Sequence, residues 1–228
     1  MRWLSPFACG LTLLAGAGHA ETLRVPSQYA TIIAALDAAA YLDTVLVAPG
    51  VHSHAETRSV DLWNGPQDVT SVGFLQFGVF LASEGGPDVT TLDLSEGSGS
   101  TLAVLAAGRA ASHATVQGFR FVVPENGVGI RADCSYGIDV RDCVFETGVP
   151  HGGWGLARNG GSSRVVDCTF DGLARAMNLY GCDLVLECCL VSDCSSEYGE
   201  LYASPGPGAY DAALTIRDSV FRGNHWSW

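Results

Sequence analysis

The 228-residue sequence contains no lysine, so all 12 of its positively charged side chains are arginines. A lysine nucleophile or a lysine general base is therefore excluded. Acidic residues outnumber the arginines, with 24 aspartates and glutamates and a formal net charge of −12. Such a charge repels nucleic acids and anionic membrane surfaces, so we expect no nucleic acid partner.

Long apolar segments are also absent, because no segment after residue 20 reaches the roughly 18 consecutive apolar residues of a transmembrane helix. The first 20 residues combine Met1-Arg2, an apolar stretch over residues 7–18 and the small residues of Gly18-His19-Ala20. This pattern is typical of a secretory signal peptide. We therefore expect residues 1–20 to be removed on export and the protein to be secreted or periplasmic, without membrane insertion.

Cysteine is missing between residues 21 and 133, whereas seven cysteines fall between residues 134 and 194. The odd number leaves at least one thiol unpaired within the chain. Three of the seven are expected to be small apolar core residues: Cys143, Cys168 and Cys188. Three others lie near turns and are the candidates for oxidation: Cys182, Cys189 and Cys194.

A motif of β-branched and aromatic residues recurs along the chain, over residues 116–121, 140–145 and 165–170. Two further segments continue it to Leu190 and Phe221, so the final apolar residues are 24, 25, 20 and 31 positions apart. A period in the low twenties, rich in β-branched residues and Gly or Asp turns, favours one set of short strands per coil. The repeat predicts an all-β protein, a right-handed parallel β-helix (solenoid).

Equivalent residues of successive coils lie about 4.8 Å apart in such a solenoid, so like side chains stack on like. We expect one inward apolar column at Phe121, Phe145, Phe170, Leu190 and Phe221. A second inward column contains Phe119, Cys143, Cys168, Cys188 and Ser219. A third column, of acidic residues, contains Asp142, Asp167, Glu187 and Asp218.

The N-terminal part is expected to cover the first coil, because an open solenoid end exposes apolar side chains. Residues 31–40 predict a short capping α-helix with Thr31 as its N-cap, and residues 43–50 predict the first strand. Accordingly, we assign residues 21–50 to the cap helix and first strand, and residues 51–228 to the coils.

Residues 25–39 and 43–50 together resemble the N-terminal segment of the pectin lyase-like superfamily, and residues 78–93 resemble its second recurring segment. The chain departs from that pattern at Ile33, where glutamine is usual, and at Tyr41-Leu42, where glycine is usual. The resemblance implies a right-handed parallel β-helix, and it covers nearly all of the chain after the signal segment.

The resemblance does not extend to a recognisable catalytic set. The four short motifs that polygalacturonase-like members carry are absent, and the glutamines expected of methylesterase-like members all precede the well-formed repeats. Pectate lyase-like chemistry, which needs carboxylates for Ca²⁺ and an arginine base, stays open. We expect no cofactor, with Ca²⁺ at Asp142 and Asp167 as the alternative; simple turn carboxylates are the other interpretation of these two residues.

A second cluster gathers aromatic and polar residues on two consecutive coils, beginning at the segment His151-Gly-Gly-Trp154. It predicts a carbohydrate-binding face formed by Trp154, Arg158, Asn159, Asn178 and Tyr180, with the two rings as stacking platforms. A surface loop whose tryptophan merely packs on the solenoid is the alternative. Asp171 and Arg175, close to this cluster in sequence, are the candidates for catalysis.

The sequence thus predicts an exported β-helix protein with a binding or structural role at a carbohydrate-rich surface. A polysaccharide or cell-surface glycan is the expected partner. The rival hypothesis is a polysaccharide lyase or glycoside hydrolase that acts on an acidic glycan such as pectin. A third is an adhesin-like repeat from a longer, truncated surface protein, because only seven residues follow Phe221.

Overall fold

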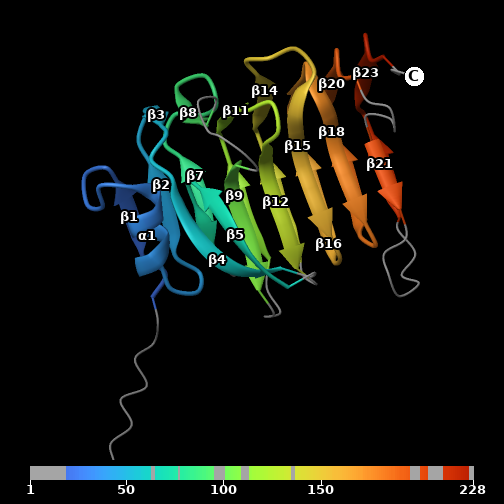
Figure 1. The fold of residues 1–228 in the computed structure, drawn as a ribbon. Coiled ribbons are helices and arrows are strands. Elements are labelled where there is room, and N and C mark those ends of the chain that lie inside the picture. Colours follow the sequence, from blue (N-terminus) through green and yellow to red (C-terminus); the bar gives the residue numbers. More distant parts are fainter. Residues whose placement is uncertain are drawn as a thin grey trace, which may run out of the picture.

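A computed structural model describes most of the chain, with the backbone alone for residues 101–108 and Cys134. The described ranges are residues 19–62, 65–76, 78–94, 101–108, 113–134, 137–195, 201–204 and 213–225. Strands in parallel sheets form a β-solenoid of about six coils with one short helix. Figure 1 shows the coils following one another along a single axis, from β1 and α1 to β21 and β23.

Each regular coil contributes one strand to each of three sheets. The first sheet contains β1 (Thr22–Val25), β2 (Thr44–Val47), β7 (Phe80–Ser83), β10 (Ala114–Gln117), β13 (Ile138–Arg141), β16 (Ser162–Val166), β19 (Asp183–Glu187) and β22 (Leu214–Arg217). The second sheet contains β3 (Gly50–His52), β8 (Thr90–Asp93), β11 (Arg120–Val123), β14 (Val144–Thr147), β17 (Thr169–Asp171), β20 (Leu190–Ser192) and β23 (Val220–Arg222).

The third sheet carries the longest strands, and its outer face is the front of the molecule in Figure 1. It contains β4 (Glu56–Leu62), β5 (Gly65–Ser71), β9 (Thr101–Gly108), β12 (Val128–Cys134), β15 (Gly152–Asn159), β18 (Leu173–Tyr180) and β21 (Leu201–Ser204), and β6 (Phe74–Leu75) pairs with β9. All pairings between described strands are parallel except β4 with β5, which form an antiparallel hairpin. This hairpin interrupts the parallel coils that the sequence predicts from residue 51 onward.

The capping helix forms as predicted. Helix α1 (Ile32–Ala38) begins after Thr31, whose side-chain oxygen accepts a hydrogen bond from the Ala34 amide at 3.1 Å. The helix buries Ile32 and Leu36 in the same core as the first strands. It therefore covers the N-terminal end of the apolar interior, where an open coil would otherwise meet water.

The interior contains a ladder of stacked phenylalanines. The ring of Phe145 lies between Phe121 and Phe170, with centroids 4.6 and 4.7 Å away and ring planes almost parallel. Inward-facing glycines leave room for these rings, since a Cβ on Gly155 would lie 2.5 Å from Phe170 Cδ1, and one on Gly129 would lie 2.7 Å from Phe145 Cδ1. The predicted aromatic column is thus confirmed over these three coils.

The predicted register is wrong by one residue in the following coil. Phe170 pairs with Val191 and not with Leu190, so Cys189 replaces Cys188 in the sulfur column beneath Cys168. Cys188 instead is exposed and takes a positive φ of 54°. The backbone explains the shift, because the left-handed residue of each repeat belongs at the turn and not in the core.

The same shift removes Glu187 from the predicted acidic column. The left-handed turn positions are Asp142, Asp167, Cys188 and Asp218, with φ between 48° and 54°. Glu187 lies one residue earlier, paired with Val166 and with Arg217, and it forms an ion pair with Arg164. Asp is one of the few residues that tolerates the left-handed conformation, so the column reflects turn geometry.

Cys182 and Cys189, two of the three cysteines that the sequence made candidates for oxidation, are free thiols in the structure, and the third, Cys194, is buried. Cys189 belongs to the core, where its sulfur accepts a hydrogen bond from the Cys168 amide at 3.5 Å. Hydrogen bonding with Cys143 and with Cys189, together with burial, raises the pKa of the Cys168 thiol. These cysteines therefore pack as small apolar side chains.

Candidate functional site

The outer face of the third sheet brings together side chains from four successive coils. In the parallel pairing of β15 with β18, Trp154 lies beside Arg175, Asn159 lies beside Tyr180, and Ala157 lies beside Asn178. Since equivalent positions lie one strand spacing apart, residues distant in sequence form short outward columns. The predicted carbohydrate-binding residues of β15 and β18 therefore lie on adjacent strands.

The glycines of the segment His151-Gly-Gly-Trp154 set the position of the tryptophan. Gly153 has a φ of 57°, and a Cβ there would lie 2.5 Å from the carbonyl oxygen of Pro124. Only glycine fits this close approach without displacing backbone. The Trp154 amide then donates to the Gly127 carbonyl at 2.9 Å, which fixes the start of β15 against the preceding coil.

Arg175 holds the aromatic side chains of the face in place. Its guanidinium lies 5.1 Å from the ring centroid of Trp154 and 5.2 Å from that of Tyr202. Its Nη1 also donates a hydrogen bond to Asn178 Oδ1 at 2.9 Å. A planar cation between two aromatic faces is a favourable arrangement, and it restricts the rotation of both rings.

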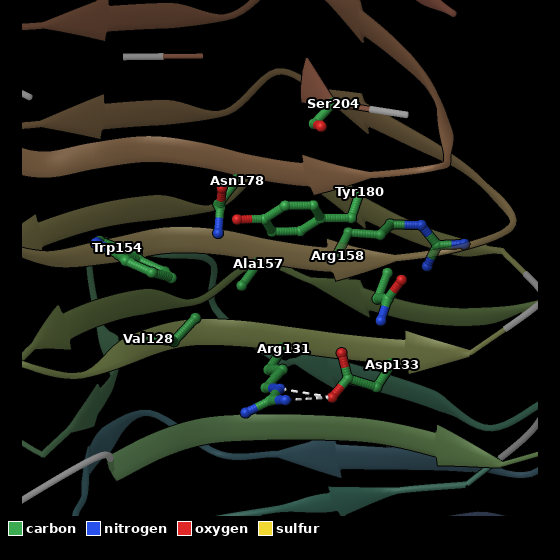
Figure 2. A pocket seen from close by; sticks show the side chains of 10 residues that line it. Val128, Arg131, Asp133, Trp154, Ala157, Arg158, Asn178, Tyr180 and Ser204 are labelled. Carbon is green, nitrogen blue, oxygen red and sulfur yellow. Dashed lines mark hydrogen bonds and ion pairs between the residues drawn. The ribbon is translucent and has the colours of Figure 1, made fainter. Parts of the chain in front are cut away.

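A cavity of about 500 Å³ opens on this face, a volume within the range of small-ligand sites. Figure 2 shows its walls, with Trp154 at one side and the Tyr180 ring extending along its strand towards Asn178. All five residues predicted to bind carbohydrate line it: Trp154, Arg158, Asn159, Asn178 and Tyr180. The structure thus gathers the predicted cluster around one space.

The β12 side of the cavity contains two charged residues that were not predicted from the sequence. Arg131 and Asp133 line it, and both Nε and an Nη of Arg131 lie 2.6 Å from one carboxylate oxygen of Asp133. Figure 2 shows this pair side by side on its strand. Arg131 and Asp133 are two positions apart on a strand that follows residues 116–121. Residues with this i, i+2 spacing lie on the same face of a strand, and this is the sequence signal that could have indicated the pair.

Arg158 is a different kind of lining residue. It stands in a column between Ala132 and Leu179, its side chain is almost fully buried, and its Nη2 donates to the Ser162 carbonyl at 3.2 Å. Burial raises the pKa of the neighbouring Cys182 thiol, although the Arg158 guanidinium acts in the opposite direction. Arg158 therefore supports the cavity wall more than it reaches into the cavity.

The two candidates for catalysis lie on different sheets. Asp171 ends β17 in the second sheet, where its Oδ1 accepts a hydrogen bond from the Ser192 hydroxyl at 2.6 Å. Arg175 is on β18 in the third sheet, engaged by Trp154 and Asn178. Neither residue is among those that line the cavity, so the geometry does not assemble them as an acid–base pair around it.

The two candidates for Ca²⁺ are neighbours on successive coils. Asp142 and Asp167 occupy equivalent left-handed turn positions, outside the cavity. Burial, together with the charges of Asp167 and Asp88, raises the pKa of the Asp142 carboxyl above its ordinary value. Within the described ranges, no three His, Cys, Asp or Glu side chains form a group suited to a metal ion.

A second cavity, of about 440 Å³, adjoins the first on the same face. It lies between the β4–β5 hairpin and the starts of β12 and β15, and shares Val128, Arg131 and Trp154 with its neighbour. Two exposed carboxylates, of Asp68 and Glu125, are part of its lining.

In the part of the chain that the structure describes, no helix is long and apolar enough to cross a membrane. Comparisons with protein families, with curated proteins and with solved structures find no match to this chain. The assignment of function therefore depends on the β-solenoid fold and on the geometry of the third sheet.

Proposed function

We propose that this protein is exported and binds a carbohydrate chain on the outer face of the third sheet. The observation that carries the proposal is the gathering of Trp154, Asn159, Asn178 and Tyr180 around one 500 Å³ cavity. Aromatic faces stack on the apolar face of a sugar ring, while amides exchange hydrogen bonds with its hydroxyls. The mixture of these two side-chain types suits a polyhydroxylated ligand better than a purely apolar one.

The arrangement supports rigid binding. Arg175 and the close packing around Gly153 hold Trp154 before any ligand arrives. A preorganised platform loses little conformational entropy on binding, which improves affinity.

A polysaccharide lyase or hydrolase is the competing proposal, and we place it second. It requires an acid–base pair beside the sugar, whereas Asp171 lies on the second sheet, bonded to Ser192. A lyase of the pectate type would also need Ca²⁺, for which Asp142 and Asp167 are the candidates; they too lie away from the cavity lining.

The proposed export is supported by the sequence of residues 1–20, most of which lie outside the described residues. Kinship with the pectin lyase-like superfamily, including a right-handed coil, is supported by the β-solenoid and by residues 25–50. An exported binding solenoid would meet polysaccharides or cell-surface glycans as its partners.

Glycan-array binding followed by calorimetric titration tests the proposal. We expect the Trp154→Ala and Tyr180→Ala variants to lose about tenfold or more in affinity for the best array ligand. Tyr41→Ala is the matched control, since Tyr41 is 63% exposed and lies outside the cavity. Absence of binding to every glycan, or equal binding by all three variants, would overturn the proposal.

A further inference from the structure

The two cavities on the third sheet are halves of one groove. They share the side chains of Val128, Arg131 and Trp154 in their lining, so they adjoin one another along these three residues. Trp154 is only partly buried and stands at the junction, exposed to both spaces. Each half on its own has a volume typical of a small-ligand pocket. A ligand that fills both must be extended.

The halves differ in their chemistry. The first half presents Tyr180 and the amide of Asn159, and its lining includes the largely buried amide of Asn178. The second half presents the exposed carboxylates of Asp68 and Glu125, together with the exposed imidazole of His151. The groove is thus aromatic and amide-rich at one end and acidic at the other.

The arginine common to both halves does not offset this acidity. The Arg131 guanidinium is already matched by Asp133, whose side chain is 4% exposed. Across the whole chain, acidic residues are twice as numerous as basic ones. A uronate sugar would therefore meet like charge in the second half, whereas an ammonium group would meet opposite charge.

We infer that the groove binds an oligosaccharide chain whose units carry amino groups, with at least one such unit beside Asp68 and Glu125. This inference rests on the proposed carbohydrate binding and specifies its ligand. The aromatic and amide half holds a sugar ring irrespective of its charge. The acidic half selects the cationic chain over its neutral and anionic counterparts.

The expected selectivity follows from partly exposed ion pairs. Two such pairs favour the cationic ligand by about tenfold over the neutral one at low salt, because each contributes about threefold. The preference falls as salt is added, since exposed charges are screened. Affinity also rises from the monosaccharide to the oligomer that fills both halves, and then levels off.

Calorimetric titration with three series of oligosaccharides, from monomer to hexamer, tests the inference. The series are β-1,4-linked glucosamine, its N-acetylated neutral form, and galacturonate. The double variant Asp68→Asn/Glu125→Gln should bind glucosamine and N-acetylglucosamine oligomers equally. Asp61→Asn is the control, because Asp61 is an exposed carboxylate of the same hairpin outside both cavities and should keep the preference.

The outcomes separate the inference from the proposal beneath it. The inference and the proposed function are both supported if the glucosamine oligomers bind most tightly and the double variant loses this preference. Binding that is independent of charge or of chain length, or that is tightest for galacturonate, overturns the inference and leaves carbohydrate binding intact. Failure of all three series, together with an empty glycan array, overturns the proposed function itself.

Discussion

Replacement of Phe145 by alanine tests the stacked interior most severely. The ring is fully buried and lies within 4.7 Å, centroid to centroid, of Phe121 on one side and Phe170 on the other. Phe→Ala substitutions in cores cost about 3–5 kcal/mol, because transfer free energy is lost and a cavity remains. Two broken ring pairs, each worth about 0.5–1.5 kcal/mol, place Phe145→Ala at the upper end of that range.

Urea unfolding followed by circular dichroism measures this change, together with the thermal midpoint. Since about 1 kcal/mol shifts the midpoint of a 150–250-residue domain by 2–4 °C, we expect a decrease on the order of 10 °C. Phe80→Ala is the matched control, because Phe80 is 44% exposed and should lose less than about 1 kcal/mol. Equal losses for the two variants would refute the stacked-coil arrangement.

Three further predictions concern the turns and the groove. Burial and neighbouring carboxylates raise the pKa of Asp142, so its charged form is unfavourable in the folded state. Asp142→Asn should therefore raise the thermal unfolding midpoint at pH 7. This gain in stability should vanish below about pH 3.9, where the carboxyl of Asp142 is protonated in both the folded and the unfolded state. A gain that does not depend on pH would contradict this cause. Gly153→Ala should reduce both glycan affinity and stability, measured by titration and thermal unfolding, because a Cβ would lie 2.5 Å from the Pro124 carbonyl oxygen. Unchanged affinity in that variant would mean that Trp154 is positioned by other contacts. Arg175→Lys keeps the positive charge but loses the planar stack of the guanidinium against Trp154. Acrylamide quenching of the Trp154 fluorescence should therefore increase, with the signal of Trp154 taken as the difference from a Trp154→Phe variant. Unaltered quenching would argue against the role of Arg175 in positioning Trp154.

The sequence predicts the repeated fold well because the repeat makes one set of physical demands several times. Thr31 as a cap, the strand after Asp43, and the Phe121–Phe145–Phe170 ladder all follow from local patterns that the structure confirms. Each coil must bury side chains at the same inward positions, so a pattern that recurs in neighbouring coils identifies these positions more reliably than a pattern in one coil alone.

The register of the fourth repeat could not be read in this way. Adjacent Cys188 and Cys189 are chemically identical, so composition does not say which one faces the core. Backbone conformation decides, since the turn requires a left-handed residue and Cys188 occupies it with a φ of 54°. The asymmetric hairpin of β4 and β5 was missed for a related reason, because it interrupts the repeat instead of continuing it.

The candidate site was predictable as a cluster, but its shape was not. Trp154 and Tyr180 are recognisable as exposed aromatics between polar residues, and the structure places both at one cavity. The contribution of Arg131 and Asp133 depends on which strands are neighbours, and the role of Arg175 depends on side-chain packing with Tyr202. Such long-range contacts have no signature in a local window of sequence.

A crystal structure with a bound glucosamine oligosaccharide tests the central claim most directly. We predict sugar rings over Trp154 and Tyr180, with an amino group close to the carboxylates of Asp68 and Glu125. A ligand bound to the first or second sheet, with the groove of the third sheet filled only by solvent, would contradict the account.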